Sequence, residues 1–172
     1  RPERCVPELF AEMAARTPEA PAVGDDKQQW TYEELDRRSN QFAHHLRALG
    51  IGPESRVAVL LDRSCEFVVA MLAAMKAGAA YVPLDPQHPA ERILFILRDV
   101  GASAVVSVAD IARNNSGTDA EIVLLDRHER AYRAEPTTPL PLTIAGDNLA
   151  YVIYTSGSTG VPLERYGSAS RW

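Results

Sequence analysis

The sequence predicts an α/β fold in which a mostly parallel sheet is flanked by helices. Strand-like apolar runs alternate along the chain with segments whose apolar residues recur at helical spacing. The strand-like runs are continuously apolar, which is typical of parallel strands covered on both faces. The length of 172 residues, 46% of them hydrophobic, suits about one domain of an ordinary globular protein.

Apolar periodicity and capping residues predict four main helices. The first is expected from about Pro7 to Arg16, where four residues form one apolar stripe: Val6, Leu9, Phe10 and Met13. The second begins after Thr31, which forms a capping box with Glu34, and it ends before Gly50. Two further helices are expected over about residues 65–77 and 90–99.

Short apolar runs between these helices predict the strands. They lie at residues 22–23, 56–61, 78–84, 104–108, 122–125 and 149–154. Residues 24–27 are expected to form a turn. Residues 131–147 contain three prolines, so we expect a surface connection rather than a core element.

Composition argues against several classes of function. A net charge of −5 and a pI near 5.4 argue against a nucleic-acid-binding protein. The longest apolar run, Phe67 to Met75, is far shorter than the roughly 20 residues of a membrane span, and no signal peptide is evident. Cys5 and Cys65 indicate two reduced structural thiols in a cytoplasmic protein, although a nucleophilic cysteine stays open.

The stretch with the most chemical information directly follows the last predicted strand. It consists of six small residues: Thr155, Ser156, Gly157, Ser158, Thr159 and Gly160. Glycines let the backbone approach a ligand, successive N–H groups can cradle phosphate oxygens, and hydroxyls add donors. Ligands bind at this position on α/β sheets. The stretch matches neither a Walker A loop nor a dinucleotide fingerprint, and by composition alone a flexible linker is the alternative.

Three ordered motifs resemble those of amino-acid adenylation domains in nonribosomal peptide synthetases, which are adenylate-forming enzymes. The six-residue loop is similar to the phosphate-loop signature of that family. Trp30 to Leu35 resembles its T-Y-x-E-L motif, and Met75 to Asp85 resembles K-A-G-x-A-Y-x-P-L-D, which continues to Arg92. The resemblance covers about residues 4–162.

The resemblance implies an ATP-dependent, aminoacyl-adenylate-forming activity for the intact domain. Residues 1–162 would be the N-terminal part of that domain, a partial subdomain of the adenylate-forming fold. The loop from Thr155 to Gly160 would hold the β- and γ-phosphates of ATP, which is used with Mg²⁺. The implied partners are ATP, an amino acid, a condensation domain, and a downstream carrier domain that bears phosphopantetheine. An acyl- or aryl-CoA ligase is the closest alternative within the superfamily.

The pattern breaks directly after Pro162. Leu163 stands where the family has lysine, and Glu164 stands where it has glycine, so we expect weaker phosphate binding. Residues 163–172 match no family segment and are expected to be a disordered tail. The family's catalytic and metal-binding residues follow this point, so we assign none here and expect no activity from the chain alone.

Two other interpretations stay open. The chain could be half of a split enzyme that needs a complementing chain, or a non-catalytic nucleotide-binding module. Because the predicted sheet ends at Tyr154, an unpaired strand edge would also favour self-association.

Overall fold

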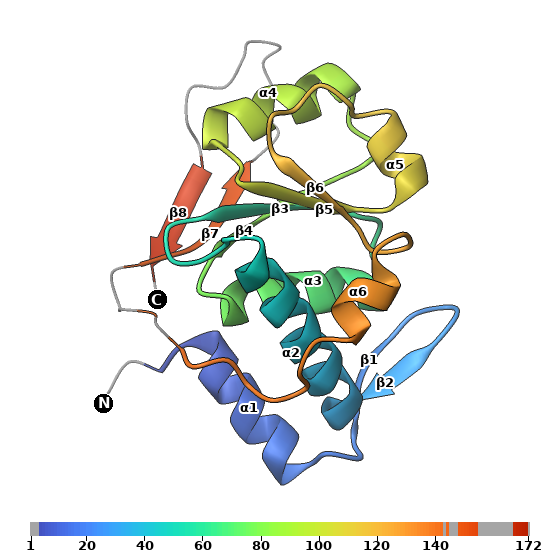
Figure 1. Ribbon diagram of the computed structural model, residues 1–172, viewed down its shortest axis with the longest axis vertical. Coiled ribbons are helices and arrows are strands. Elements are labelled where there is room, and N and C mark those ends of the chain that lie inside the picture. The colour runs from blue at the N-terminus through green and yellow to red at the C-terminus, as the bar shows by residue number, and fades with distance from the viewer. Residues whose placement is uncertain (1–3, 143, 145–147, 155–166, 172) are drawn as a thin grey trace.

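The computed structural model describes residues 4–142, 144, 148–154 and 167–171. Its centre is a six-stranded sheet of order β6-β5-β3-β4-β7-β8 (Figure 1). The strands are β3 (Arg56–Leu60), β4 (Ala80–Leu84), β5 (Ala104–Ser107), β6 (Glu121–Leu124), β7 (Leu149–Tyr154) and β8 (Gly167–Arg171). Five of them run parallel, and β8 is antiparallel to β7. The predicted α/β class with a mostly parallel sheet is therefore confirmed.

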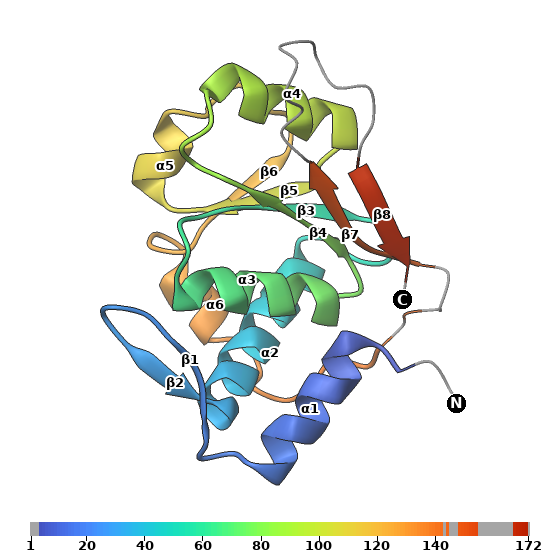
Figure 2. The same ribbon diagram turned by 180° about the vertical axis from the view of Figure 1, so that it is seen from behind.

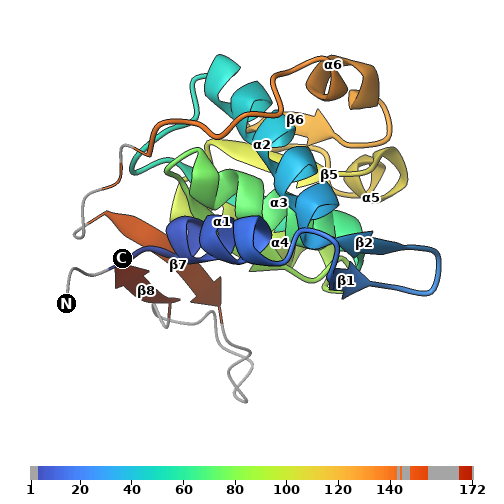
Figure 3. The same ribbon diagram turned by 90° about the horizontal axis from the view of Figure 1, so that it is seen from below.

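Helices cover both faces of this sheet (Figures 1 and 2). One face carries α1 (Val6–Arg16), α2 (Tyr32–Ala48), α3 (Cys65–Lys76) and α6 (Glu129–Arg133). The other face carries α4 (Ala90–Val100) and α5 (Ala109–Arg113). A two-stranded hairpin of β1 (Pro21–Gly24) and β2 (Gln29–Thr31) projects at one end of α2 (Figure 3).

Side chains along the parallel strands point alternately to the two faces of the sheet, and they form two separate cores. In β3, Val57 and Val59 belong to the core beneath α2 and α3. Their neighbours Ala58 and Leu60 belong to the core beneath α4. Because successive strand residues point to opposite faces, a continuously apolar strand is needed to fill both cores.

The helix boundaries follow the capping signals of the sequence. The capping box of α2 is present: Glu34 donates its backbone N–H to Thr31 Oγ1 at 3.3 Å, and Thr31 donates its own to Glu34 Oε2 at 3.0 Å. The α4 helix stops at Gly101, whose φ of 62° lies in the left-handed region that favours glycine. None of the described helices is long and apolar enough to cross a membrane.

The apolar stripe predicted for the first helix does not form its buried face. Val6 and Leu9 are each 46% exposed. The residues turned inward are Pro7 and Ala14, and Phe10 packs at the edge of the core. A short helix contacts its neighbours along a narrow strip and can bury only a few positions. The buried face of α1 is therefore determined by the elements that pack against it, not by the spacing of its apolar residues.

The described part of the expected surface connection, residues 131–142, contacts the core more closely than the sequence indicates. Tyr132 and Leu140 pack against the core under α2. The Asn40 side chain of α2 donates a hydrogen bond to Thr137 O at 2.8 Å, and Gln41 Nε2 donates to Arg133 O at 2.6 Å. The expected connection therefore begins inside a helix, because residues 131–133 belong to α6, and side chains of α2 satisfy carbonyl groups of the segment that follows.

Part of the expected disordered tail forms a strand. Gly167–Arg171 is β8, and it pairs with β7 from Leu149 to Tyr154, with one irregularity between Leu149 and Tyr151. The predicted unpaired edge at β7 is therefore also wrong. Without β8, strand β7 would present a row of unpaired backbone N–H and C=O groups at the edge of the sheet. Such an edge favours pairing with a further strand.

Candidate functional site

The predicted phosphate loop leaves the sheet at the carboxyl end of β7. Its six residues lie outside the described residues: Thr155, Ser156, Gly157, Ser158, Thr159 and Gly160. The structure does describe the strand from which the loop departs. The candidate site is therefore built from β7 and its surroundings.

Both ends of β7 are held by side chains from other elements. At its start, Leu149 donates its backbone N–H to Glu54 Oε1 at 3.1 Å. At its end, the Tyr154 hydroxyl donates to Asp99 Oδ2 of α4 at 2.6 Å. These contacts hold the two ends of the strand, and they place its last residue, Tyr154, beside α4.

The K-A-G-x-A-Y-x-P-L-D segment supports β7 from the neighbouring strand. Tyr81 of β4 is the register partner of Tyr151 of β7, and their rings lie 5.9 Å apart. Directly after β4, Asp85 Oδ1 accepts the backbone N–H of Gln87 at 2.8 Å and shapes the turn at the same edge of the sheet. The prediction that the Tyr81 to Asp85 segment is structural fits these contacts.

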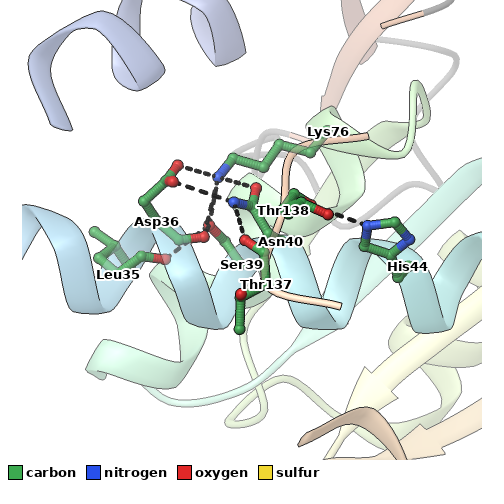
Figure 4. Close-up of polar contacts among 8 residues, drawn as sticks. All are labelled: Leu35, Asp36, Ser39, Asn40, His44, Lys76, Thr137 and Thr138. Carbon is green, nitrogen blue, oxygen red and sulfur yellow. Dashed lines mark hydrogen bonds and ion pairs between the residues drawn. The ribbon is translucent and has the colours of Figure 1, made fainter. Parts of the chain in front are cut away.

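Lys76, at the end of α3, is the centre of a polar cluster that sequence reasoning missed (Figure 4). Its Nζ donates to Asp36 Oδ1 at 2.7 Å, and to Ser39 Oγ and Asn40 Oδ1 at 2.8 Å each. The lysine side chain is only 7% exposed, and Nζ lies 5.1 Å from the ring centre of Phe10 in α1. The cluster thus joins α1, α2 and α3.

The chemistry of this cluster is structural. Burial lowers the pKa of Lys76, and the carboxylate of Asp36 opposes that shift. An ammonium has three N–H donors, and three side-chain acceptors already occupy them, which leaves none for a substrate. A sequence signal did exist: a single lysine ends the apolar run of α3, and Asp36 and Asn40 lie four residues apart on α2.

The polar contacts continue from this cluster to the connection before β7 (Figure 4). Asn40 reaches Thr137 O, and His44 Nε2 lies 2.9 Å from Thr138 O. Both His44 and its neighbour His45 are half-buried. Among the described residues, no group of three His, Cys, Asp or Glu side chains could hold a metal ion.

Asp25 joins the β1–β2 hairpin to the first turn of α3. Its Oδ2 accepts the backbone N–H of Cys65 at 2.9 Å, and its Oδ1 accepts those of Lys27 at 2.9 Å and Gln28 at 3.0 Å. These bonds, chiefly those from Cys65 and Lys27, lower the pKa of Asp25 to about 2. The carboxylate is consequently charged, and it holds the hairpin against the helix at neutral pH.

The two cysteines are free thiols, and neither has the surroundings of a nucleophile. Burial, reinforced by the nearby Asp25 carboxylate, raises the pKa of Cys65 to about 11. Burial also raises the pKa of Cys5. Since the thiolate is the reactive form, these thiols are suited to structural roles at neutral pH.

The lowered pKa of Asp25 predicts that the fold loses stability in acid. Because its folded-state pKa of about 2 lies below the ordinary value of 3.8, its contribution is present above pH 4 and is lost as the pH falls from about 4 to about 2. Asp25→Asn is therefore expected to lower Tm at pH 7, with the difference from the unsubstituted chain shrinking across that interval. Thermal melts from pH 7 to pH 2 measure this.

The matched control for that series is Asp26→Asn, at the exposed neighbouring position of the same turn. It should change Tm little at any pH, because substitutions at exposed positions usually have small effects. A Tm difference for Asp25→Asn that stays constant down to pH 2 would contradict the assigned role.

Comparisons with known proteins identify a family and relatives that this chain resembles. The family model described as AMP-binding enzyme matches residues 10–162. A linear gramicidin synthase of Brevibacillus parabrevis is 44% identical over 158 residues, which are 92% of this chain and 2% of that protein. Phosphinothricin tripeptide synthetase PhsC from Streptomyces viridochromogenes is 46% identical over 164 residues, which are 94% of this chain and 15% of that protein. The chain thus spans only a small part of these relatives.

Solved structures of similar proteins share the fold. A crystal structure of the nonribosomal peptide synthetase FmoA3 matches with a TM-score of 0.83 and 30% identity, over 90% of this chain and 16% of that one. A form of the same protein with bound AMPPNP matches with a TM-score of 0.82. The N-terminal domain of FACL13 from Mycobacterium tuberculosis matches with a TM-score of 0.86 and 26% identity, over 98% of this chain and 44% of that one.

Proposed function

The chain belongs to the family of AMP-binding enzymes, and from that premise we propose that residues 1–162 form the N-terminal part of an amino-acid-activating adenylation domain. The observation that carries the proposal is a parallel sheet whose strand β7 leads directly into the sequence T-S-G-S-T-G. The identities of 44% and 46% with peptide synthetases favour this branch over an acyl- or aryl-CoA ligase. Free thiols agree with a cytoplasmic location.

The proposed reaction of the intact domain joins an amino acid to ATP. The amino-acid carboxylate attacks the α-phosphorus, the bond between the α-phosphorus and the bridging oxygen breaks, and pyrophosphate leaves with that electron pair. Within this chain, the loop from Thr155 to Gly160 would hold the β- and γ-phosphates through backbone N–H groups and hydroxyls. A carrier domain bearing phosphopantetheine would then accept the aminoacyl group, and a condensation domain would be a further partner.

The described residues do not fit a protein-bound Mg²⁺ ion. They contain no group of three suitable ligands, so no step of the proposal passes through such an ion. Mg²⁺ would instead arrive with the ATP phosphates, which it ordinarily bridges.

Binding of ATP to the 172-residue chain tests the role of the loop. Because Leu163 and Glu164 replace a lysine and a glycine of the family pattern, the double change Leu163→Lys and Glu164→Gly should raise ATP affinity. A charge-assisted contact contributes about 1.5–3 kcal/mol, which corresponds to roughly tenfold or more in Kd. Gly157→Val should weaken ATP binding both in the unsubstituted chain and in the double variant, because the valine side chain blocks the approach of phosphate to the backbone. Calorimetry with ATP and AMP measures these effects.

Ser116→Val is a suitable control, because it introduces the same valine side chain at an exposed loop position and should leave ATP affinity unchanged. ATP affinity that is insensitive to Gly157→Val would remove the loop as the phosphate site. The assay for activity is amino-acid-dependent ATP–pyrophosphate exchange, and we expect none from the chain alone. Robust exchange would overturn that expectation, and exchange restored by a second chain would favour a split enzyme.

A further inference from the structure

A cavity of about 580 Å³ lies between the β1–β2 hairpin, α2 and α6, at the carboxyl ends of strands other than β7. Its apolar lining includes Leu61, which follows β3, and Leu125, which follows β6. Trp30 of the hairpin and Tyr132 of α6 contribute aromatic surface. The volume falls within the range of small-molecule sites, and the carboxyl edge of a parallel sheet is where such sites occur.

Arg38 of α2 provides the distinctive polar group of this cavity. Its guanidinium carbon lies 4.4 Å from the ring centre of Trp30, so the group is stacked and its orientation is restricted. Its Nε atom is enclosed and has no hydrogen-bond partner in the described part of the chain. Burial, together with the nearby charge of Arg133, lowers the pKa of Arg38. Arginine nevertheless stays charged in proteins. The nearby carboxylate of Glu34 raises the pKa of Arg38, but its hydrogen bond goes to the backbone N–H of Thr31. Within the described residues, the cavity therefore contains a half-buried cation with no carboxylate bonded to it.

The carboxylates around the cavity do not supply that partner, because most of them are engaged elsewhere. Asp25 accepts backbone N–H groups, and Glu66 accepts from Gln28 Nε2 at 2.5 Å. Asp126 accepts from the backbone N–H of Ala109, and Glu129 pairs with Arg133 at 2.6 Å. The remaining charged lining residues are exposed at the rim and carry both signs: Asp26, Lys27, Asp62 and Arg63.

We propose that this cavity binds a small monocarboxylate with an apolar body, its carboxylate paired with Arg38 and its body lying on the aromatic and leucine surface. A guanidinium presents donors in a planar fork that matches a carboxylate. The guanidinium thereby gains an anionic partner that the described residues do not provide. Several carboxylates lie around the cavity, so repulsion of a second negative charge favours a singly charged ligand over a dianion such as phosphate. This site goes beyond the proposed adenylation function.

Phenylacetate is a probe with the required chemistry, and its binding can be followed at the site itself. In a Trp172→Phe background, Trp30 is the sole tryptophan, so its fluorescence reports on the cavity. The Nε–Hε signal of Arg38 in ¹⁵N-correlated NMR spectra reports on the ion pair. We expect saturable changes in both signals with phenylacetate. We expect much weaker changes with phenethylamine, which has the same body and the opposite charge, and with orthophosphate.

Two variants on the same helix separate the site from general effects. Arg38→Gln keeps much of the length of the side chain without the charge, and it should weaken phenylacetate binding at least tenfold. Arg37→Gln changes the exposed neighbour and should leave the affinity unchanged. Far-UV circular dichroism checks that both variants fold. If Arg38→Gln does not fold, Arg38→Lys replaces it, because lysine keeps the charge and loses the planar fork.

Several outcomes would overturn the proposal. One is the absence of saturable binding up to concentrations on the order of 10 mM. Another is an equal response to phenylacetate, phenethylamine and orthophosphate. A third is undiminished binding in Arg38→Gln, or in Arg38→Lys where that variant is used. Since the measurement needs neither ATP nor the loop after β7, its failure leaves the proposed adenylation function untouched.

Discussion

Replacing Lys76 by methionine is expected to lower the free energy of unfolding by about 3–5 kcal/mol, the usual cost of removing one partner from a buried ion pair. Methionine fills a similar volume but has no donor. Asp36 would lose its ion-pair partner, and Ser39 and Asn40 would lose the ammonium that now satisfies their side-chain oxygens. The ring of Phe10 would lose its cation as well. Urea unfolding followed by circular dichroism measures the effect.

The control for this change is Lys27→Met, which makes the same substitution at an exposed position in the β1–β2 turn. It should change stability by no more than about 0.5 kcal/mol. Asp36→Asn tests the ion pair from its other side and should also destabilise the fold. If Lys76→Met were as mild as Lys27→Met, the cluster would have no substantial role in joining the three helices.

Replacing Phe42 by alanine is expected to cost about 3–5 kcal/mol, as for other large aromatic residues truncated in a core. Phe42 is fully buried on α2. Its ring makes an edge contact with Tyr132 of α6, with centroids 5.3 Å apart. Truncation would leave a cavity between α2 and α6 that rigid neighbouring backbone cannot close completely. The free energy of unfolding in urea again provides the measurement.

Phe95→Ala is the matched control, because Phe95 of α4 is 44% exposed and its truncation should cost far less. Equal losses for the two variants would mean that α6 and α2 do not pack as described. Since Tyr132 also lines the cavity beside Arg38, Phe42→Ala should additionally weaken phenylacetate binding, through loss of the support behind that ring.

Features determined by neighbouring residues could be predicted from the sequence. The α/β class follows from local alternation of apolar runs, and the start of α2 follows from the reciprocal bonds of Thr31 and Glu34. The end of α2 follows from Gly50, whose φ of 84° lies in the left-handed region. In each case the physical cause lies within a few residues, so the sequence contains it. The phosphate loop was also predicted locally, and its role stays a prediction.

Features determined by distant residues could not be predicted in the same way. The packing of α1 against α2 and α3 determines which of its faces is buried. The position of residues 131–142 depends on hydrogen bonds from side chains of α2. The strand β8 exists because β7 offers an open edge, which the composition of residues 167–171 alone does not indicate. Hydrophobic periodicity indicates which face of a helix or strand is apolar, but it does not indicate which other element packs against that face.

By itself, then, the sequence determined the fold class, the limits of the main helices and strands, and the family to which the chain belongs. Only the tertiary structure decided the strand order β6-β5-β3-β4-β7-β8, the partners of Lys76 and the cavity around Arg38. The reason is that a charged side chain in the interior is stable only where other elements supply its partners. Those partners lie 36 to 40 residues from Lys76 along the chain, and packing alone brings them together.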